Sequence, residues 1–239
     1  NDKLKSIEEL KKNKINIIKF NKNIKLKNIS FKYPSKTTNL FNDINLEINK
    51  GEIIGIKGQS GEGKSTLINM ICGFLVPDKG EILVDDDVNI NTNIRGWRSI
   101  LGYIPQQTYL FNGSLKENIC FSKNGPVDED SFNQAIDMAQ LRNLVNASPD
   151  KENTQVGERG ILLSGGQIQR ISLARCLYKN PEIMILDEAT SSLDSINEKK
   201  ILESISLLKG KKTIIIVSHR DSSLSLCDRV LYLDKKKLS

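Results

Sequence analysis

One nine-residue stretch limits the folds that this chain can adopt. "GQSGEGKST", Gly58 to Thr66, fits the pattern G-x-x-x-x-G-K-[ST] without a mismatch. It follows the apolar run "GEIIGIKG" and precedes a stretch that we expect to be helical from Lys64 to about Leu75. Glycines between a strand and a helix let successive N–H groups face an anion with no Cβ in the way. The stretch therefore predicts an α/β fold with a phosphate-binding turn.

The residue types in this loop indicate a nucleotide with Mg²⁺. Lys64 would bring positive charge to the β- and γ-phosphates, and the Ser65 hydroxyl would be a magnesium ligand. A glycine-rich turn can also be only a tight connection, but the complete motif between a strand and a helix favours nucleotide binding. The predicted nucleotide-binding residues of the loop are Gly58, Gln59, Ser60, Gly61, Glu62, Gly63, Lys64, Ser65 and Thr66.

The apolar pattern of the rest of the chain predicts two kinds of sheet. "IKLKNISFKY" and "INLEI" alternate and are expected to be half-exposed antiparallel strands. "EILVDD" and "ILGYI" predict two further short strands, and Ser114 to roughly Tyr178 is expected to be helical. "EIMILD" and "KTIIIVS" are typical of parallel strands covered on both faces, and "RVLYLD" is expected to close that sheet. We predict a mainly parallel α/β core, an N-terminal antiparallel β subdomain and an inserted α-helical subdomain at about residues 108–178.

Net charge, cysteine positions and the length of the apolar runs indicate which classes of partner and which environment suit this chain. The net charge of +6 is compatible with a nucleotide, a nucleic acid or a membrane surface. Lysine is frequent along the whole chain, so we interpret the charge as compositional bias and expect no nucleic-acid partner. The four cysteines lie singly, which is typical of reduced thiols. The longest apolar runs are strand-sized.

Polar side chains end two of the apolar runs. Asp187 and Glu188 end "IMILDE", and His219, the single histidine, ends "TIIIVSHR". The carboxyl ends of parallel strands share one edge of a sheet with the phosphate loop. We expect Asp187 to hold Mg²⁺, Glu188 to orient or deprotonate water, and His219 to hydrogen-bond the γ-phosphate. Without the loop, the same residues would be interpreted as a solvated strand end and a structural histidine.

A second glycine turn occurs in "ILLSGGQIQR", where Ser164, Gly165 and Gly166 begin an expected helix. The start of a helix exposes N–H groups to an anion, yet this turn has no lysine. Together with the phosphate loop, "ILDEATSSLD" and "SHR", the segment "LSGGQ" resembles the nucleotide-binding domain of ATP-binding cassette (ABC) proteins. The resemblance covers the chain from about Ile24 to its end.

The resemblance implies a P-loop NTPase core that hydrolyses ATP with Mg²⁺. In that family two copies pack head to tail, so that the second glycine turn of one copy closes over the ATP held by the other. The residues implied in this contact are Ser164, Gly165, Gly166 and Gln167. A helix start suits this role because it offers donors to phosphate charge that Lys64 and Mg²⁺ already neutralise in part.

Three further positions match the family one at a time. Tyr33 in "FKYP" matches an aromatic residue that stacks on adenine, and the alternative is a tyrosine at a strand end. Gln106 in "YIPQQ" matches a glutamine that approaches the magnesium ion and is expected to take part in catalysis. Asp194 in "SSLD" matches a loop that crosses the dimer interface. Ser192 departs mildly from the alanine that is frequent in the family.

Two segments, "YLFNGSLKENI" and "TQVGERG", resemble the exporter branch of the family, in which a membrane domain precedes the ATPase. There the region of Glu158 and Arg159 lies near the cytoplasmic ends of transmembrane helices. We therefore expect residues 1–22 to be a linker from a fused membrane domain and residues 23–239 to be the ATPase domain, at the cytoplasmic face of a membrane. Because the chain begins with Asn1, we expect it to be a piece of a longer protein.

The prediction is an ATPase that drives export, and two alternatives stay open. The first is a soluble ABC ATPase acting on nucleic acid or ribosomes, whose usual tandem cassette, coiled coil or zinc module has no counterpart in this sequence. The second is a regulatory cassette that does not hydrolyse ATP. The presence of Glu188 and His219 favours hydrolysis over this second alternative.

Overall fold

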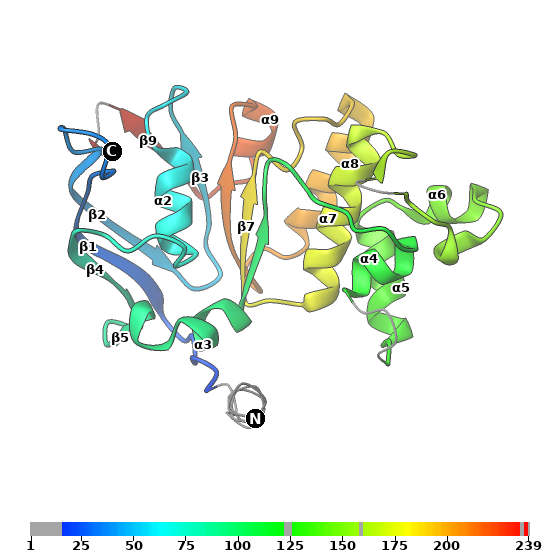
Figure 1. Ribbon diagram of the computed structural model, residues 1–239, viewed down its shortest axis with the longest axis horizontal. Coiled ribbons are helices and arrows are strands. Elements are labelled where there is room, and N and C mark those ends of the chain that lie inside the picture. Colours follow the sequence, from blue (N-terminus) through cyan, green and yellow to red (C-terminus); the bar gives the residue numbers. More distant parts are fainter. Residues whose placement is uncertain (1–15, 122–125, 158–159, 235–236, 239) are drawn as a thin grey trace, which may run out of the picture.

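The computed structural model describes residues 16–121, 126–157, 160–234 and 237–238, and it contains two sheets with helices around them (Figure 1). The antiparallel sheet has the order β2-β1-β4-β5. Its strands are β1 (Asn23–Phe31), β2 (Phe41–Asn49), β4 (Lys79–Val84) and β5 (Val88–Asn89). The pairing of β1 with β2 confirms the predicted antiparallel strands, and "EILVDD" joins them as β4.

The second sheet has the order β10-β9-β3-β8-β7-β6, and its strands from β9 to β6 are parallel. Its strands are β3 (Ile53–Lys57), β6 (Leu101–Ile104), β7 (Ile183–Asp187), β8 (Thr213–Val217), β9 (Arg229–Asp234) and β10 (Lys237–Leu238). Every residue of β7 and β8 is buried, as their continuous apolar runs predict. The sheet does not end at "RVLYLD": β10 pairs antiparallel with this strand.

The helices follow the predicted alternation with the strands. They are α2 (Lys64–Ile71), α3 (Ile94–Ser99), α4 (Leu115–Cys120), α5 (Glu129–Met138), α6 (Arg142–Ala147), α7 (Gly165–Lys179), α8 (Ser195–Ser206) and α9 (Asp221–Leu224), with 3-10 turns at Ile90–Asn93 and Lys151–Asn153. Helix α2 ends before the predicted Leu75, because Gly73 adopts a left-handed conformation (φ +70°) that terminates it. Helices α4 to α7 lie within the stretch predicted to be helical.

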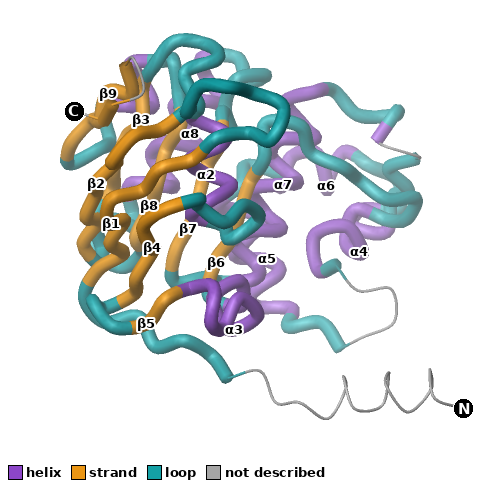
Figure 2. Tube along the Cα trace, turned by 60° about the vertical axis from the view of Figure 1, so that its left-hand side comes forward, coloured by secondary structure: helices purple, strands orange, loops and turns teal. Residues whose placement is uncertain are grey.

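Two hydrophobic cores lie on the two faces of the parallel sheet. One core joins the antiparallel sheet, α2 and α3, and the other joins the helices from α4 to α8. Neighbouring strand residues alternate between them: Ile183 and Ile185 face the first core, whereas Met184 and Leu186 face the second. Figure 2 shows the strands of the antiparallel sheet beside those of the parallel sheet. The parallel strands are therefore covered on both sides.

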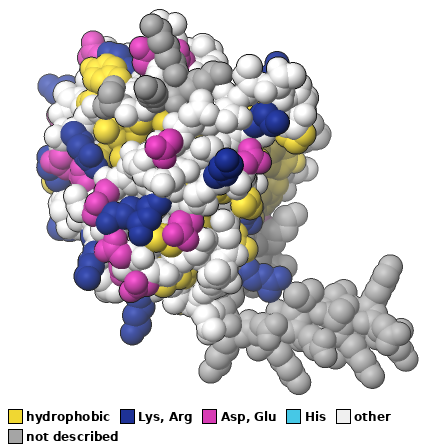
Figure 3. Space-filling model, turned by 90° about the vertical axis from the view of Figure 1, so that its left-hand side faces the viewer, with side chains coloured by type: hydrophobic (Ala, Val, Ile, Leu, Met, Phe, Trp, Pro, Cys, Tyr) yellow, Lys and Arg dark blue, Asp and Glu magenta, His cyan; other side chains and the backbone are white. Residues whose placement is uncertain are grey.

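Two residues that precede β1 belong to the first core. Ile18 and Phe20, within the predicted linker 1–22, are buried in it. Residues 1–15, the larger part of the predicted linker, lie outside the described residues. No helix of the described chain combines the length and the apolar composition needed to cross a membrane. On the face shown in Figure 3, acidic and basic side chains are interspersed.

Candidate nucleotide-binding site

The phosphate loop joins β3 to α2 and has a backbone that requires glycine. Gly61 and Gly63 have φ values of +86° and +103°, a region that residues with a side chain rarely adopt. A Cβ on Gly63 would lie 2.8 Å from the Phe41 ring, and one on Gly58 would lie 2.6 Å from the Leu233 carbonyl oxygen. The loop therefore folds tightly and leaves its N–H groups close to any bound anion.

Lys64 is the first residue of α2, and its side chain turns back into the loop. The Nζ atom donates to the carbonyl oxygens of Gly58, at 2.6 Å, and Gln59, at 2.9 Å. The residue is only 8% exposed. The first turn of α2 contains no acidic residue, so its positive dipole end adds to the charge of this ammonium group. A phosphate group bound here would interact with the Lys64 ammonium group and with the N-terminal end of α2.

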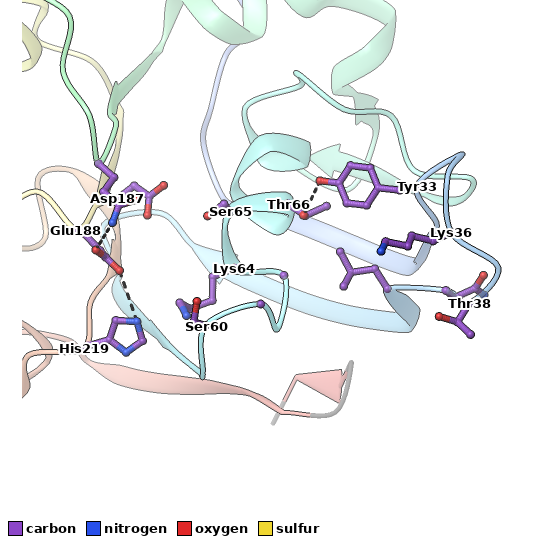
Figure 4. A pocket seen from close by; sticks show the side chains of 15 residues that line it. Tyr33, Lys36, Thr38, Ser60, Lys64, Ser65, Thr66, Asp187, Glu188 and His219 are labelled. Atoms are coloured by element: carbon purple, nitrogen blue, oxygen red, sulfur yellow. Dashed lines mark hydrogen bonds and ion pairs between the residues drawn. The ribbon is translucent and has the colours of Figure 1, made fainter.

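A pocket of about 580 Å³ opens beside the loop. It brings together most of the residues that the sequence predicts for the site. The predicted residues that line it are Tyr33, Ser60, Gly61, Gly63, Lys64, Ser65, Thr66, Gln106, Asp187, Glu188 and His219. Figure 4 shows Asp187, Glu188 and His219 at one end, the phosphate loop in the middle and Tyr33 at the other end.

Tyr33 lies where β1 leads into its loop. Its ring packs edge to face on Phe31 at 5.0 Å, and its hydroxyl hydrogen-bonds the Thr66 hydroxyl at 2.9 Å. The ring is half-exposed and lines the pocket, so one face is accessible to a planar ligand. This position is compatible with the predicted stacking on adenine.

Four lining residues were not predicted from the sequence: Lys36, Thr38, Asn39 and Leu40. They belong to the loop between β1 and β2 and follow Tyr33 in "YPSKTTNLF". A loop of this kind has no periodic signal. Its place after the candidate adenine-binding residue is the one indication that could have identified it. Lys36 adds a second positive charge to the pocket, at the end where Tyr33 lies (Figure 4).

Asp187 is the last residue of β7 and is 7% exposed. Tyr103 of β6 donates a hydrogen bond from its hydroxyl to the Asp187 Oδ2, at 3.2 Å. Burial raises the pKa of Asp187 above its ordinary value, although the Tyr103 hydrogen bond and the charge of Lys64 act in the opposite direction. Burial and the neighbouring Asp187 raise the pKa of Tyr103, so its hydroxyl remains a donor.

Glu188 follows directly and has a left-handed backbone, with φ at +50°. Its N–H donates to the Val217 carbonyl oxygen at 2.9 Å. Gln106 donates from Nε2 to the Glu188 Oε2 at 2.6 Å, and the His219 Nε2 lies 3.5 Å from Oε1. The structure thus joins three residues predicted separately. A non-glycine residue keeps this conformation only where surrounding contacts hold it, and these contacts fix the place of the Glu188 side chain.

The donor set is suitable for Mg²⁺ bound together with phosphate oxygens. Ser65, Gln106 and Asp187 offer hydroxyl, amide and carboxylate oxygens, the hard ligands that Mg²⁺ prefers. Within the described ranges, no three His, Cys, Asp or Glu side chains converge to form a metal site by themselves. Mg²⁺ usually keeps waters and takes substrate phosphates as ligands, so these residues fit a nucleotide-bound ion.

The second glycine turn lies apart from this pocket. Ser164 caps α7 through a capping box: its hydroxyl accepts from the Gln167 N–H at 3.3 Å, and the Gln167 Oε1 accepts from the Ser164 N–H at 2.8 Å. Ser164 and Gly165 are exposed. Asp194 caps α8 by accepting the Asn197 N–H at 2.9 Å. One chain therefore does not bring these residues to its own Lys64. Glu158 and Arg159 lie outside the described residues.

Comparison with known proteins agrees with this geometry. A model of the ABC transporter family matches residues 41–191. The chain is 41% identical over 219 residues to the ATP-dependent permease MDL1 of Candida albicans, covering 90% of this chain and 32% of that protein. It is 38% identical over 213 residues to a putative export ATP-binding/permease protein of Rickettsia bellii, covering 89% of this chain and 37% of that one.

A solved structure shares the fold. The structure of a bacterial Atm1-family ABC exporter with ATP bound superposes with a TM-score of 0.87 at 32% identity, covering 93% of this chain and 39% of that one. The chain spans about a third of the length of the curated relatives described above. The resemblance drawn from the motifs and the predicted α/β architecture are both confirmed. The chain belongs to the ABC transporter family.

Proposed function

We propose that this chain binds Mg-ATP and hydrolyses it to ADP and phosphate as the motor domain of an exporter. One observation carries the proposal: the phosphate-loop lysine, the three candidate magnesium ligands, and Glu188 with His219 surround a single pocket. Their types match the parts that phosphoryl transfer needs, which are a phosphate cradle, oxygen ligands for Mg²⁺ and a residue that positions water.

The residues would act as follows. Lys64 and the N–H groups of the loop hold the phosphates, and Tyr33 stacks on the base. Bound Mg²⁺ would neutralise charge on the phosphate oxygens. Glu188 orients water in line with the γ-phosphate and accepts its proton, while His219 hydrogen-bonds the transferred group. The Gln106–Glu188 hydrogen bond at 2.6 Å links the residue proposed to approach the magnesium ion to the proposed base.

A second copy would complete the site. Ser164 to Gln167 lie outside the pocket of their own chain, and their exposed helix start offers N–H donors. We infer that two chains pack head to tail, so that this turn covers the ATP bound to Lys64 of the other chain and Asp194 lies at their interface. Closure would exclude water and strengthen each hydrogen bond to the phosphates.

The relatives support export as the purpose of this hydrolysis. They bear the names of permeases and export proteins, and this chain covers 32% and 37% of their lengths. We infer that the domain of residues 23–239, including a helical subdomain at about 108–178, works beside a fused transmembrane domain at the cytoplasmic face of a membrane. Residues 1–22 would connect the two domains, with Ile18 and Phe20 packed against the ATPase.

The molar mass of Glu188→Gln in solution tests the proposal. The variant lacks the proposed base but keeps both glycine turns, so Mg-ATP is expected to convert monomer to dimer. Light scattering with and without Mg-ATP measures this change in molar mass. Because the proposed base is missing, the rate of ATP hydrolysis by the variant is expected to be at least about a hundredfold lower than that of the parent.

The second glycine turn is tested in the same background. Ser164→Arg should abolish the dimer because it fills the space that the partner's phosphates would need. Ser206→Arg, an exposed change at the end of α8, should leave the dimer intact. A Glu188→Gln protein that binds ATP yet stays monomeric at high concentration would contradict the head-to-tail site.

A further inference from the structure

Gln169, inside α7, is a buried polar side chain to which the proposed chemistry gives no role. It is 5% exposed, and its amide group hydrogen-bonds to the loop that follows β7. Its Nε2 donates to the Ser191 Oγ at 2.8 Å and to the Glu188 carbonyl oxygen at 3.3 Å. Its Oε1 accepts the Ser192 N–H at 2.9 Å. The amide of one side chain therefore forms hydrogen bonds to three residues of the loop that follows β7, and Glu188 is one of them.

The start of α7 packs against the same loop. A Cβ on Gly166 would lie 3.1 Å from the Ser192 carbonyl oxygen, and one on Gly165 would lie 3.4 Å from the Ser192 Cβ. The glycine turn and the loop after β7 are thus in close contact. One helical turn further along α7, the Gln169 side chain hydrogen-bonds to the same loop. The loop and the second glycine turn would move together.

Glu188 needs such support because its backbone is strained. A left-handed glutamate persists only where neighbouring contacts determine its conformation. Arg220, which follows β8, also contacts this loop: its guanidinium group donates to the Ser191 carbonyl oxygen at 2.8 Å. Gln169 is the side chain that contacts the main chain of both Glu188 and Ser192.

We propose that Gln169 is a positioning residue: it sets the direction of the Glu188 carboxylate and couples it to the second glycine turn of the same chain. This inference rests on the proposed function. Since that turn would contact the partner's ATP while Glu188 acts on the chain's own ATP, Gln169 links the two sites of the dimer. A displacement of about 1 Å at Glu188 would cost on the order of a hundredfold in rate.

The kinetic test compares three variants in the 239-residue chain. Gln169→Leu keeps the approximate size of the side chain and removes its three hydrogen bonds to the loop. We expect kcat for ATP hydrolysis to fall about 10- to 100-fold, while KM for ATP changes less than about twofold. Gln169→Glu keeps an acceptor for the Ser192 N–H but places a carboxylate oxygen against the Glu188 carbonyl oxygen, so its kcat should fall at least as far as that of Gln169→Leu. Gln134→Leu, the same change at an exposed helical position, should match the parent.

Hydrogen exchange provides a readout that does not need turnover. In Gln169→Leu the Ser192 amide loses its acceptor, so its exchange without nucleotide should become about tenfold faster, whereas amides of the β8 ladder should exchange as in the parent. A variant that merely misfolds would lose protection in β8 and raise KM as well. Gln169→Glu, which keeps the acceptor, should protect Ser192 in part.

The outcomes separate the two proposals. An active parent with an equally active Gln169→Leu overturns the positioning role and leaves the proposed function standing. A fall in kcat without faster exchange at Ser192 also overturns it, because the loss would then arise elsewhere. A parent chain that hydrolyses no ATP at any concentration refutes the proposed function, and the positioning role fails with it.

Discussion

Two lysines near the phosphate loop, Lys64 and Lys57, differ in whether they can bind a phosphate. Lys64 is nearly buried and fixed by two carbonyl oxygens of its own loop, so its ammonium group is already in place before a phosphate arrives. Lys57, at the end of β3, carries the same charge close by in the sequence, but it forms an exposed ion pair with Asp221 at 2.8 Å. The two lysines differ in position and burial rather than in charge.

We expect Lys64→Ala to weaken ATP binding about 10- to 100-fold, because hydrogen bonds to a charged group contribute about 1.5–3 kcal/mol. Titration with a fluorescent ATP analogue measures the dissociation constant. Lys57→Ala is the control and should change it less than about twofold. Equal losses in both variants would mean that net charge, rather than the placed ammonium group, attracts the nucleotide.

At the scale of elements, one carboxylate joins the chain entering β1 to the end of β4. Asp85, in a left-handed turn, accepts the N–H groups of Asn21 at 2.8 Å, Lys22 at 2.7 Å and Asn23 at 3.3 Å. Burial opposes ionisation of Asp85, but these hydrogen bonds outweigh it and hold the pKa below its ordinary value of 3.8. The contact orients the residues that precede the antiparallel sheet.

Asp85→Asn should lower the free energy of unfolding at pH 7 by about 1 kcal/mol, because the amide keeps a single acceptor oxygen without a charge, and its NH2 group cannot accept the Asn21 hydrogen bonds. A carboxyl whose pKa is lower in the folded state stabilises above its unfolded value, near 3.8, and this contribution disappears as the pH falls through the lowered pKa. The difference between variant and parent should therefore shrink below pH 3.8. Urea unfolding at several pH values measures it.

The neighbouring Asp87→Asn is the matched control, since Asp87 is exposed in the same turn. It should leave the unfolding free energy within about 0.5 kcal/mol of the parent. A pH-independent effect of Asp85→Asn would show that the charge of Asp85 contributes nothing to this contact.

At the scale of the whole molecule, the two glycine turns of one chain do not meet. The pocket holds the phosphate loop, whereas Ser164 and Gly165 face solvent at the start of α7. If two chains complete each site, the active species is the dimer. Its fraction, and with it the rate per chain, depends on protein concentration through mass action.

We therefore expect the ATPase rate to rise more steeply than linearly with protein concentration and to become proportional to it once dimers predominate. Steady-state phosphate release over a dilution series measures this dependence. Ser164→Arg, which blocks the interface, should remain slow at every concentration. Strict proportionality down to dilute protein would contradict a dimeric site.

The local features of this protein can be derived from short stretches of its sequence. The turn at Gly58 to Ser65, the continuous apolar runs of β7 and β8 and the cap at Ser164 all follow from neighbouring residues, since glycine dihedrals, hydrophobic periodicity and helix capping act over a few positions. These features predicted the fold class and the place of the phosphate loop. They also predicted that Asp187 and Glu188 would end a buried strand.

Contacts between residues far apart in the sequence depend on the packing of the whole fold. Gln106 and Glu188 form a hydrogen bond across 82 positions, and Tyr103 reaches Asp187 across 84. The pocket-lining loop at residues 36–40 and the hydrogen bonds of Gln169 to the loop after β7 have no local signal. Strand order and sheet register bring these side chains together. They depend on how two cores pack against one sheet, which no short stretch of sequence encodes.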